Sequence, residues 1–130
     1  MHFCYQLLTY LFYPFSYFFL IIRKLKKKEH STRYKEKLSQ IDILRNDGFL
    51  IWFHVASVGE AMSILPLLES LDKEKKIKNI LITSTTLSSA NLLQKKLISY
   101  KKIIHQFLPL DVPKYVNKFL KHWSPNLVIF

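Results

Sequence analysis

Residues 49–60 read FLIWFHVASVGE. The first eight are nearly all apolar and rich in aromatic side chains, a composition typical of a strand that is buried on both faces of a parallel sheet. The last four, SVGE, form a short turn before a segment with helical spacing. We therefore predict a buried strand over 49–56 whose carboxyl end leads directly into a helix.

The rest of the chain repeats this alternation of apolar runs and helical spacing. Pro66 lies inside the first helical segment and should kink that helix or move its start to a later residue. Strands separated by helices of about a dozen residues predict an α/β fold with a parallel sheet, in which ligands bind beyond the carboxyl ends of the strands. The predicted helices are 61–71, 87–98 and 112–123, and the further strands are 77–84, 101–107 and 126–130.

Composition excludes several classes of protein. A chain of 130 residues allows one ordinary domain. Because the chain has only 2 glycines, a Gly-rich phosphate-binding loop is not expected. An aromatic content of 15% argues against a disordered chain. The single cysteine, Cys4, excludes an internal disulfide framework and a Cys-rich zinc site, so a reducing compartment is the default.

The N-terminal segment predicts a membrane anchor. Residues 3–22 carry no formal charge and are long enough, as a helix, to cross a hydrocarbon core of ~30 Å. Pro14 and several tyrosines make a shallow or kinked insertion the competing interpretation. Polar residues 31–45 predict one further helix, and residues 46–48 (NDG) predict a turn.

A basic run follows the apolar segment directly. By the positive-inside rule it places the chain that follows on the cytoplasmic side of a membrane, with a single uncleaved N-terminal anchor over 1–28. The residues expected to contact anionic lipid are Arg23, Lys24, Lys26, Lys27 and Lys28. The alternative is a buried apolar helix followed by a solvated charged face.

The chain carries 20 Lys and Arg against 9 Asp and Glu, a net charge of +11. Such a charge attracts nucleic acid, anionic lipid or a phosphorylated substrate. Because the densest basic cluster adjoins the apolar segment, we expect a membrane partner and no nucleic acid. The lysine pairs at 95–96 and 101–102 are interpreted first as solvated faces, with contact to lipid phosphates as the alternative.

The turn over 57–60 has two interpretations. Ser57 and Glu60 fit a capping box, in which the serine caps the helix and the glutamate reaches back to the N–H of the cap residue. Glu60 could instead act as a general base at the mouth of the sheet, with Gly59 allowing a positive φ or a close approach to a ligand. The spacing alone favours the cap. Gln can fill the capping position but cannot take a proton, so Glu60→Gln separates the two roles.

Histidines give a weaker signal. His54 lies in the apolar strand and is interpreted as a hydrogen-bonded core histidine, with contact to a bound ligand as the alternative. His105 and His122 show no metal-ligand spacing with it, so we expect no metal site.

Several segments in order resemble one family. WFHVASVGE (52–60) resembles the signature loop of the 3-deoxy-D-manno-octulosonic acid (Kdo) transferases of Gram-negative bacteria, which attach Kdo to the lipid A precursor. The segments that resemble further parts of the family's sequence are RYKEKL (33–38), ITSTT (82–86), FLPLDVP (107–113) and SPNLVIF (124–130).

The resemblance implies a GT-B fold, in which two Rossmann-like domains face a cleft. The N-terminal domain binds the lipid acceptor and the C-terminal domain binds the donor CMP-Kdo, with no metal or other cofactor. Residues 29–130 would form an incomplete Rossmann-like acceptor domain, with the donor domain absent. Glu60 would be the general base of an inverting transfer. The residues that would contact the acceptor are Ser57, Val58, Gly59, Thr83 and Thr86.

The sequence also departs from the family pattern. Thr86-Leu87-Ser88-Ser89 stands in place of Thr-Pro-Thr-Gly, and Leu110 replaces an aromatic residue. The chain ends where the next family motif would begin, so we expect a truncated or split product that is inactive without a complementing C-terminal chain. The alternative is a non-catalytic, membrane-anchored remnant or interaction module with the same fold.

Overall fold

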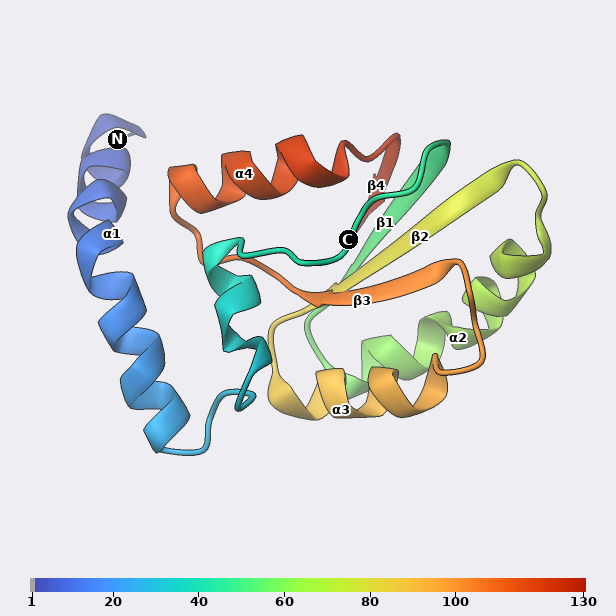
Figure 1. Ribbon diagram of the computed structural model, residues 1–130, viewed down its shortest axis with the longest axis horizontal. Coiled ribbons are helices and arrows are strands. Elements are labelled where there is room, and N and C mark those ends of the chain that lie inside the picture. The colour runs from blue at the N-terminus through green and yellow to red at the C-terminus, as the bar shows by residue number, and fades with distance from the viewer. Residues whose placement is uncertain (1) are drawn as a thin grey trace. The chain divides into compact units, whose positions relative to one another are not determined.

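The computed structural model describes residues 2–130 (Figure 1). In chain order the elements are α1 (His2–Leu25), the 3-10 helix η1 (Arg33–Leu38), β1 (Phe49–Val55), α2 (Val58–Lys73), β2 (Ile77–Ser84), α3 (Leu87–Lys96), β3 (Ile103–Phe107), α4 (Pro113–Trp123) and β4 (Leu127–Ile129). They form two compact units. The first comprises Met1–Asp42 and Pro109–His122, and the second comprises Ile43–Leu108 and Trp123–Phe130.

The second unit contains a four-stranded parallel sheet in the order β3-β2-β1-β4. In register, Ile51 of β1 pairs with Ile80 of β2 on one side and with Leu127 of β4 on the other. The chain leaves β3 at one edge and returns as β4 beside β1, so the strand order reverses next to β1. In open α/β sheets a ligand crevice opens at such a switch point.

Helices α2 and α3 cover one face of this sheet (Figure 1). Alternate residues of β1 point into that layer, because successive strand side chains face opposite sides. The buried residues of this core are Ile51, Phe53, Val55, Ala61, Leu68, Ile77, Ile80, Ile82, Leu93, Leu97 and Ile103. The predicted α/β fold with a parallel sheet is therefore confirmed.

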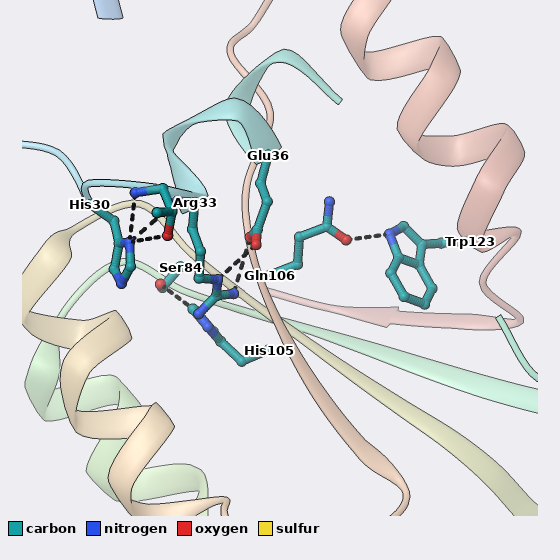
Figure 2. Close-up of polar contacts among 8 residues, drawn as sticks. His30, Arg33, Glu36, Ser84, His105, Gln106 and Trp123 are labelled. Atoms are coloured by element: carbon teal, nitrogen blue, oxygen red, sulfur yellow. Dashed lines mark hydrogen bonds and ion pairs between the residues drawn. The ribbon is translucent and has the colours of Figure 1, made fainter. Parts of the chain in front are cut away.

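The opposite face of the sheet carries buried polar side chains among apolar ones. Trp123 is completely buried, and its Nε1 donates a hydrogen bond of 2.7 Å to Oε1 of Gln106 in β3 (Figure 2). On the face covered by α2 and α3, at the carboxyl ends of β2 and β3, Ser84 Oγ lies 2.8 Å from His105 Nε2. These bonds satisfy groups that would otherwise be costly to bury.

The predicted turn before β1 is confirmed. Gly48 has a φ of 108°, and a Cβ atom there would lie 2.5 Å from Lys78 Cγ, so a larger residue would be strained and crowded. Arg45 fixes the turn by donating to the carbonyl oxygens of Asn46 at 3.0 Å and Gly48 at 3.1 Å.

In the first unit, Leu20 of α1 packs with Tyr34 and Leu38 of η1. The buried carboxylate of Glu29 forms ion pairs with Arg23 and Lys37, each at 2.7 Å. Pairing of this kind is what allows a carboxylate to be buried.

One local prediction is wrong. The helix predicted over 31–45 is reduced to η1, because Thr32 provides no side-chain cap and Ser39 ends the segment with a φ of 53°. Of the two effects predicted for Pro66, a later helix start is not observed, because α2 begins at Val58 and continues through the proline. The start is set by Ser57, whose side chain caps the helix. A kink at Pro66 stays a prediction.

Candidate active site

A cleft of about 420 Å³ opens at the carboxyl ends of β1 and β4. Most of its wall is apolar, and three polar side chains from β1 and α2 face it. This is the usual composition of a small-molecule site, and it lies at the switch point of the sheet. The lining residues are Phe53, His54, Val55, Glu60, Ser63, Ile64, Leu67, Ile129 and Phe130.

The serine half of the predicted capping box forms at the start of α2. Ser57 has extended backbone angles, and its Oγ accepts from the backbone N–H of Glu60 at 3.2 Å. Glu60 Oε2 accepts from the N–H of Ala56 at 2.7 Å, one residue before the cap, in place of the predicted bond from the N–H of Ser57. This bond fixes the carboxylate at the mouth of the cleft. Among the described residues no hydrogen bond reaches its other oxygen, Oε1, so the cap leaves one oxygen available to a ligand.

Of the two alternatives for Gly59, a positive φ is not observed. It lies in the first turn of α2, and an added Cβ would meet only Ser57 Oγ, at 3.9 Å. A close approach of a ligand to this backbone stays a prediction.

His54 is hydrogen-bonded, as predicted, but it is half-buried and faces the cleft. Its Nδ1 lies 3.0 Å from Thr83 Oγ1, which also accepts from Trp52 Nε1 at 2.9 Å. Its ring makes an edge contact with Phe130, with centroids 5.9 Å apart. Burial lowers the pKa of His54 below its ordinary value, although the nearby charge of Glu60 opposes this shift.

The structure divides the predicted acceptor residues into three groups. Ser57, Val58 and Gly59 are exposed in the turn next to Glu60. Thr83 is fully buried and supports His54 instead of facing the cleft. Thr86 caps α3, accepting from Ser89 N at 3.3 Å.

Sequence reasoning missed part of the cleft wall on α2. Ser63, Ile64 and Leu67 follow Glu60 by three, four and seven residues, and these spacings place side chains on one face of a helix. Once Glu60 was singled out, the same spacing would have identified this wall. Phe130 had no comparable local signal.

The five basic residues predicted to contact lipid are not equivalent. Arg23 pairs with Glu29, and Lys24 Nζ lies 4.7 Å from the centroid of the Tyr34 ring. Residues 26–28 are exposed beyond the end of α1. The stretch Phe3–Leu25 is the one helix in the described part of the chain that is long and apolar enough to cross a membrane. Within residues 2–130, no cluster of three or more His, Cys, Asp or Glu side chains could hold a metal ion.

The second unit is thus a parallel α/β sheet with a mostly apolar cleft at its switch point. Over residues 26–130 the chain matches the sequence profile of a family described as 3-deoxy-D-manno-octulosonic-acid transferase (kdotransferase). The chain belongs to this Kdo transferase family.

Three relatives show the extent of the similarity. A probable mitochondrial 3-deoxy-D-manno-octulosonic acid transferase of Arabidopsis thaliana is 36% identical over 96% of this chain and 28% of its own length. The 3-deoxy-D-manno-octulosonic acid transferase of Rickettsia bellii is 39% identical over 97% of this chain and 30% of its own. That of Rickettsia felis is 49% identical over 62% of this chain and 17% of its own. The chain thus spans less than a third of the length of these relatives. No solved structure matches it.

Proposed function

We propose that this chain supplies the acceptor-binding half of a GT-B glycosyltransferase that moves Kdo from CMP-Kdo to the lipid A precursor, lipid IVA. The observation that carries the proposal is the position of Glu60. Its carboxylate is held by the Ala56 N–H at the mouth of the switch-point cleft, with Oε1 left open. Membership of the Kdo transferase family supplies the reaction class.

In the proposed reaction, Glu60 takes the proton of an acceptor sugar hydroxyl as that oxygen attacks the anomeric carbon of Kdo. The new C–O bond forms while the bond from that carbon to the CMP phosphate breaks, and CMP leaves with the bonding electrons. Attack opposite the leaving group inverts the configuration. A well-placed general base contributes roughly 10²–10⁴-fold to such a step.

The donor would be bound by a complementing C-terminal sequence, because the cleft described here forms only the acceptor side. The acceptor is a glycolipid, so the site has to work at a membrane. The apolar helix α1 and the exposed lysines at 26–28 support attachment at the cytoplasmic face of the inner membrane.

A chimera tests the proposal. The matching segment of the Rickettsia bellii relative is replaced by this chain, and Kdo transfer to lipid IVA is measured. We expect Glu60→Gln to lower kcat by roughly 10²–10⁴-fold. Its unfolding midpoint should not change, because the Gln side-chain oxygen can still accept from Ala56 N–H.

Glu69→Gln is the matched control. Glu69 is an exposed glutamate of the same helix whose ion pair with Lys73 spans 3.5 Å. It should leave both transfer and stability unchanged, because exposed pairs of this kind contribute little.

The capping geometry also favours the second candidate, a non-catalytic module, since the hydrogen bonds of Glu60 are those of a helix cap. Undiminished transfer by the Glu60→Gln chimera would show that Glu60 only caps α2. If the chimera that retains Glu60 is folded and binds lipid IVA but transfers no Kdo, the non-catalytic module is favoured.

A further inference from the structure

The strongest unassigned feature lies in the first unit, where α1 is attached sideways along most of its length. Near its start, the Tyr5 hydroxyl hydrogen-bonds to the Asp111 carboxylate. Further along, Ser16 Oγ lies 2.6 Å from the Tyr115 hydroxyl, and Leu20 packs in the apolar cluster of this unit. At ~1.5 Å per residue these contacts extend over roughly 22 Å of helix.

This lateral attachment is incompatible with α1 crossing a bilayer. A spanning helix would carry its contact partners, including Asp111, into the hydrocarbon, where an ionised carboxylate is strongly disfavoured. The remaining surface of α1 is nevertheless apolar and open. The exposed large side chains on it are Phe3, Leu7, Leu8, Leu11, Phe12, Phe15, Phe18, Phe19 and Ile22. A polar seam opposite a wide apolar face is the pattern of a helix that lies in the membrane interface.

A groove of about 650 Å³ runs between α1 and α4 beside this face. Its polar lining combines cations with aromatic rings. Lys114 Nζ lies 4.4 Å from the centroid of the Tyr13 ring, and the lysines of α4 recur at helical spacing, so they share one face. The lining residues are Tyr10, Tyr13, Lys114, Asn117, Lys118 and Lys121.

Charge complementarity indicates what this groove binds. The first unit carries eleven Lys and Arg against four Asp and Glu. Two of those acids, Glu29 and Glu36, are paired within the unit, and Asp111 binds Tyr5. Tyrosine is enriched at the level of lipid headgroups, and lysine is a common ligand of phosphate.

We propose that α1 lies in the plane of a single leaflet and that the lysine–tyrosine groove binds the phosphate of an anionic phospholipid. The apolar face of α1 enters the acyl chains. The lysines of α4 extend to the headgroups, as long cationic side chains do at interfaces. The inference does not depend on Kdo transfer and holds for a non-catalytic module as well.

Vesicle binding by the full chain tests the groove. The variant K114Q/K118Q/K121Q is compared with wild type on phosphatidylcholine vesicles with and without phosphatidylglycerol. Each lysine near an anionic surface changes partitioning by about fivefold, so the triple variant should bind roughly a hundredfold more weakly to the anionic vesicles alone. The control K95Q/K96Q/K101Q removes the same charge from exposed lysines of the second unit and should change binding less than about twofold.

If both triple variants lose the same amount of vesicle binding, the chain is attracted by its net charge, and the groove is overturned as the binding site. The alternative ligand of the groove is inorganic phosphate. If phosphate displaces the chain from anionic vesicles and binds the chain equally well when no lipid is present, the proposed lipid ligand is overturned. Circular dichroism of each variant checks that the substituted chain is folded.

Labelling of the single cysteine tests the orientation of α1. A spin label at Cys4 and, separately, one in C4S/I22C should lie at equal, shallow depth and be quenched by a water-soluble relaxant added outside the vesicles. A Cys4 label that only a relaxant trapped inside the vesicles can reach would show a spanning helix and overturn the in-plane arrangement.

Discussion

Two turns of the second unit use the same local device, one after β1 and one after β2. Each places a hydroxyl residue at the N-cap of a helix. Ser57 Oγ accepts from Glu60 N at 3.2 Å, and Thr86 Oγ1 accepts from Ser89 N at 3.3 Å. The residue three positions after the cap differs. Glu60 is exposed and reaches back to Ala56, whereas Ser89 is fully buried and accepts from Thr86 Oγ1 at 2.7 Å.

The difference shows that a cap does not by itself mark a site. The β1 turn opens into a cleft because β1 borders β4, where the strand order reverses. The β2 turn follows a strand between β1 and β3, and Thr86 does not line that cleft. Position in the strand order, together with the carboxylate, separates the candidate site from an ordinary helix start.

The largest effect on stability within this comparison is expected at Thr83, the residue of β2 that supports the end of β1. Thr83→Val removes the buried oxygen that accepts from Trp52 Nε1 and lies 3.0 Å from His54 Nδ1, so both contacts are lost. Urea unfolding should show a loss of about 2 kcal/mol. Thr83→Ser keeps a hydroxyl and should lose less. Equal stability of the Val and Ser variants would mean that the hydroxyl contributes nothing.

A smaller effect, and a direct test of the comparison, comes from removing each cap. Ser57→Ala and Thr86→Ala should each cost about 1 kcal/mol in unfolding, because each removes one N-cap hydrogen bond. In the chimera only Ser57→Ala should also slow Kdo transfer, by about tenfold, through displacement of Glu60. If Thr86→Ala slows transfer as much, Thr86 contacts the acceptor and the distinction between the turns fails.

The fold could be predicted where local pattern determines it. The bounds of β2 were predicted correctly, and Ser57 caps α2 as predicted, because these depend on residues within a few positions of one another. The helix predicted over 31–45 fails because that segment is organised by distant contacts. Lys37 is buried against Glu29, and Ser39 donates to the carbonyl of Tyr115 at 2.6 Å.

The same division applies to the site. Glu60 was identified because its partners, Ser57 and Ala56, lie beside it in the chain. The wall contributed by Phe130 depends on β4 lying next to β1, which is fixed in part by Asn126 Oδ1 accepting from Leu50 N at 2.9 Å. These residues are 76 positions apart, and no local pattern specifies their pairing.

The smallest expected effect is a pH dependence at the end of β1. Burial lowers the pKa of His54 below its unfolded value of about 6.5, so the unfolded state binds more protons as the pH falls through this range. The contribution of His54 to stability is therefore complete above pH ~6.5 and is lost as the pH falls from there towards the lower pKa of the folded state. The loss should be modest, because solvent screens a half-exposed ring. In His54→Gln the midpoint of urea unfolding should depend less on pH than in the wild type.

Glu60 sharpens this test, since its charge raises the pKa of His54 against the effect of burial. In Glu60→Gln the pKa of His54, followed by NMR through its ring protons, should fall further below that of the wild type. The matching Thr86→Ala variant leaves the β1 turn intact and should not move it. A His54 pKa that rises in Glu60→Gln would mean that the carboxylate does not act on the imidazole, and His54 and Glu60 would then not form one electrostatic unit at the cleft.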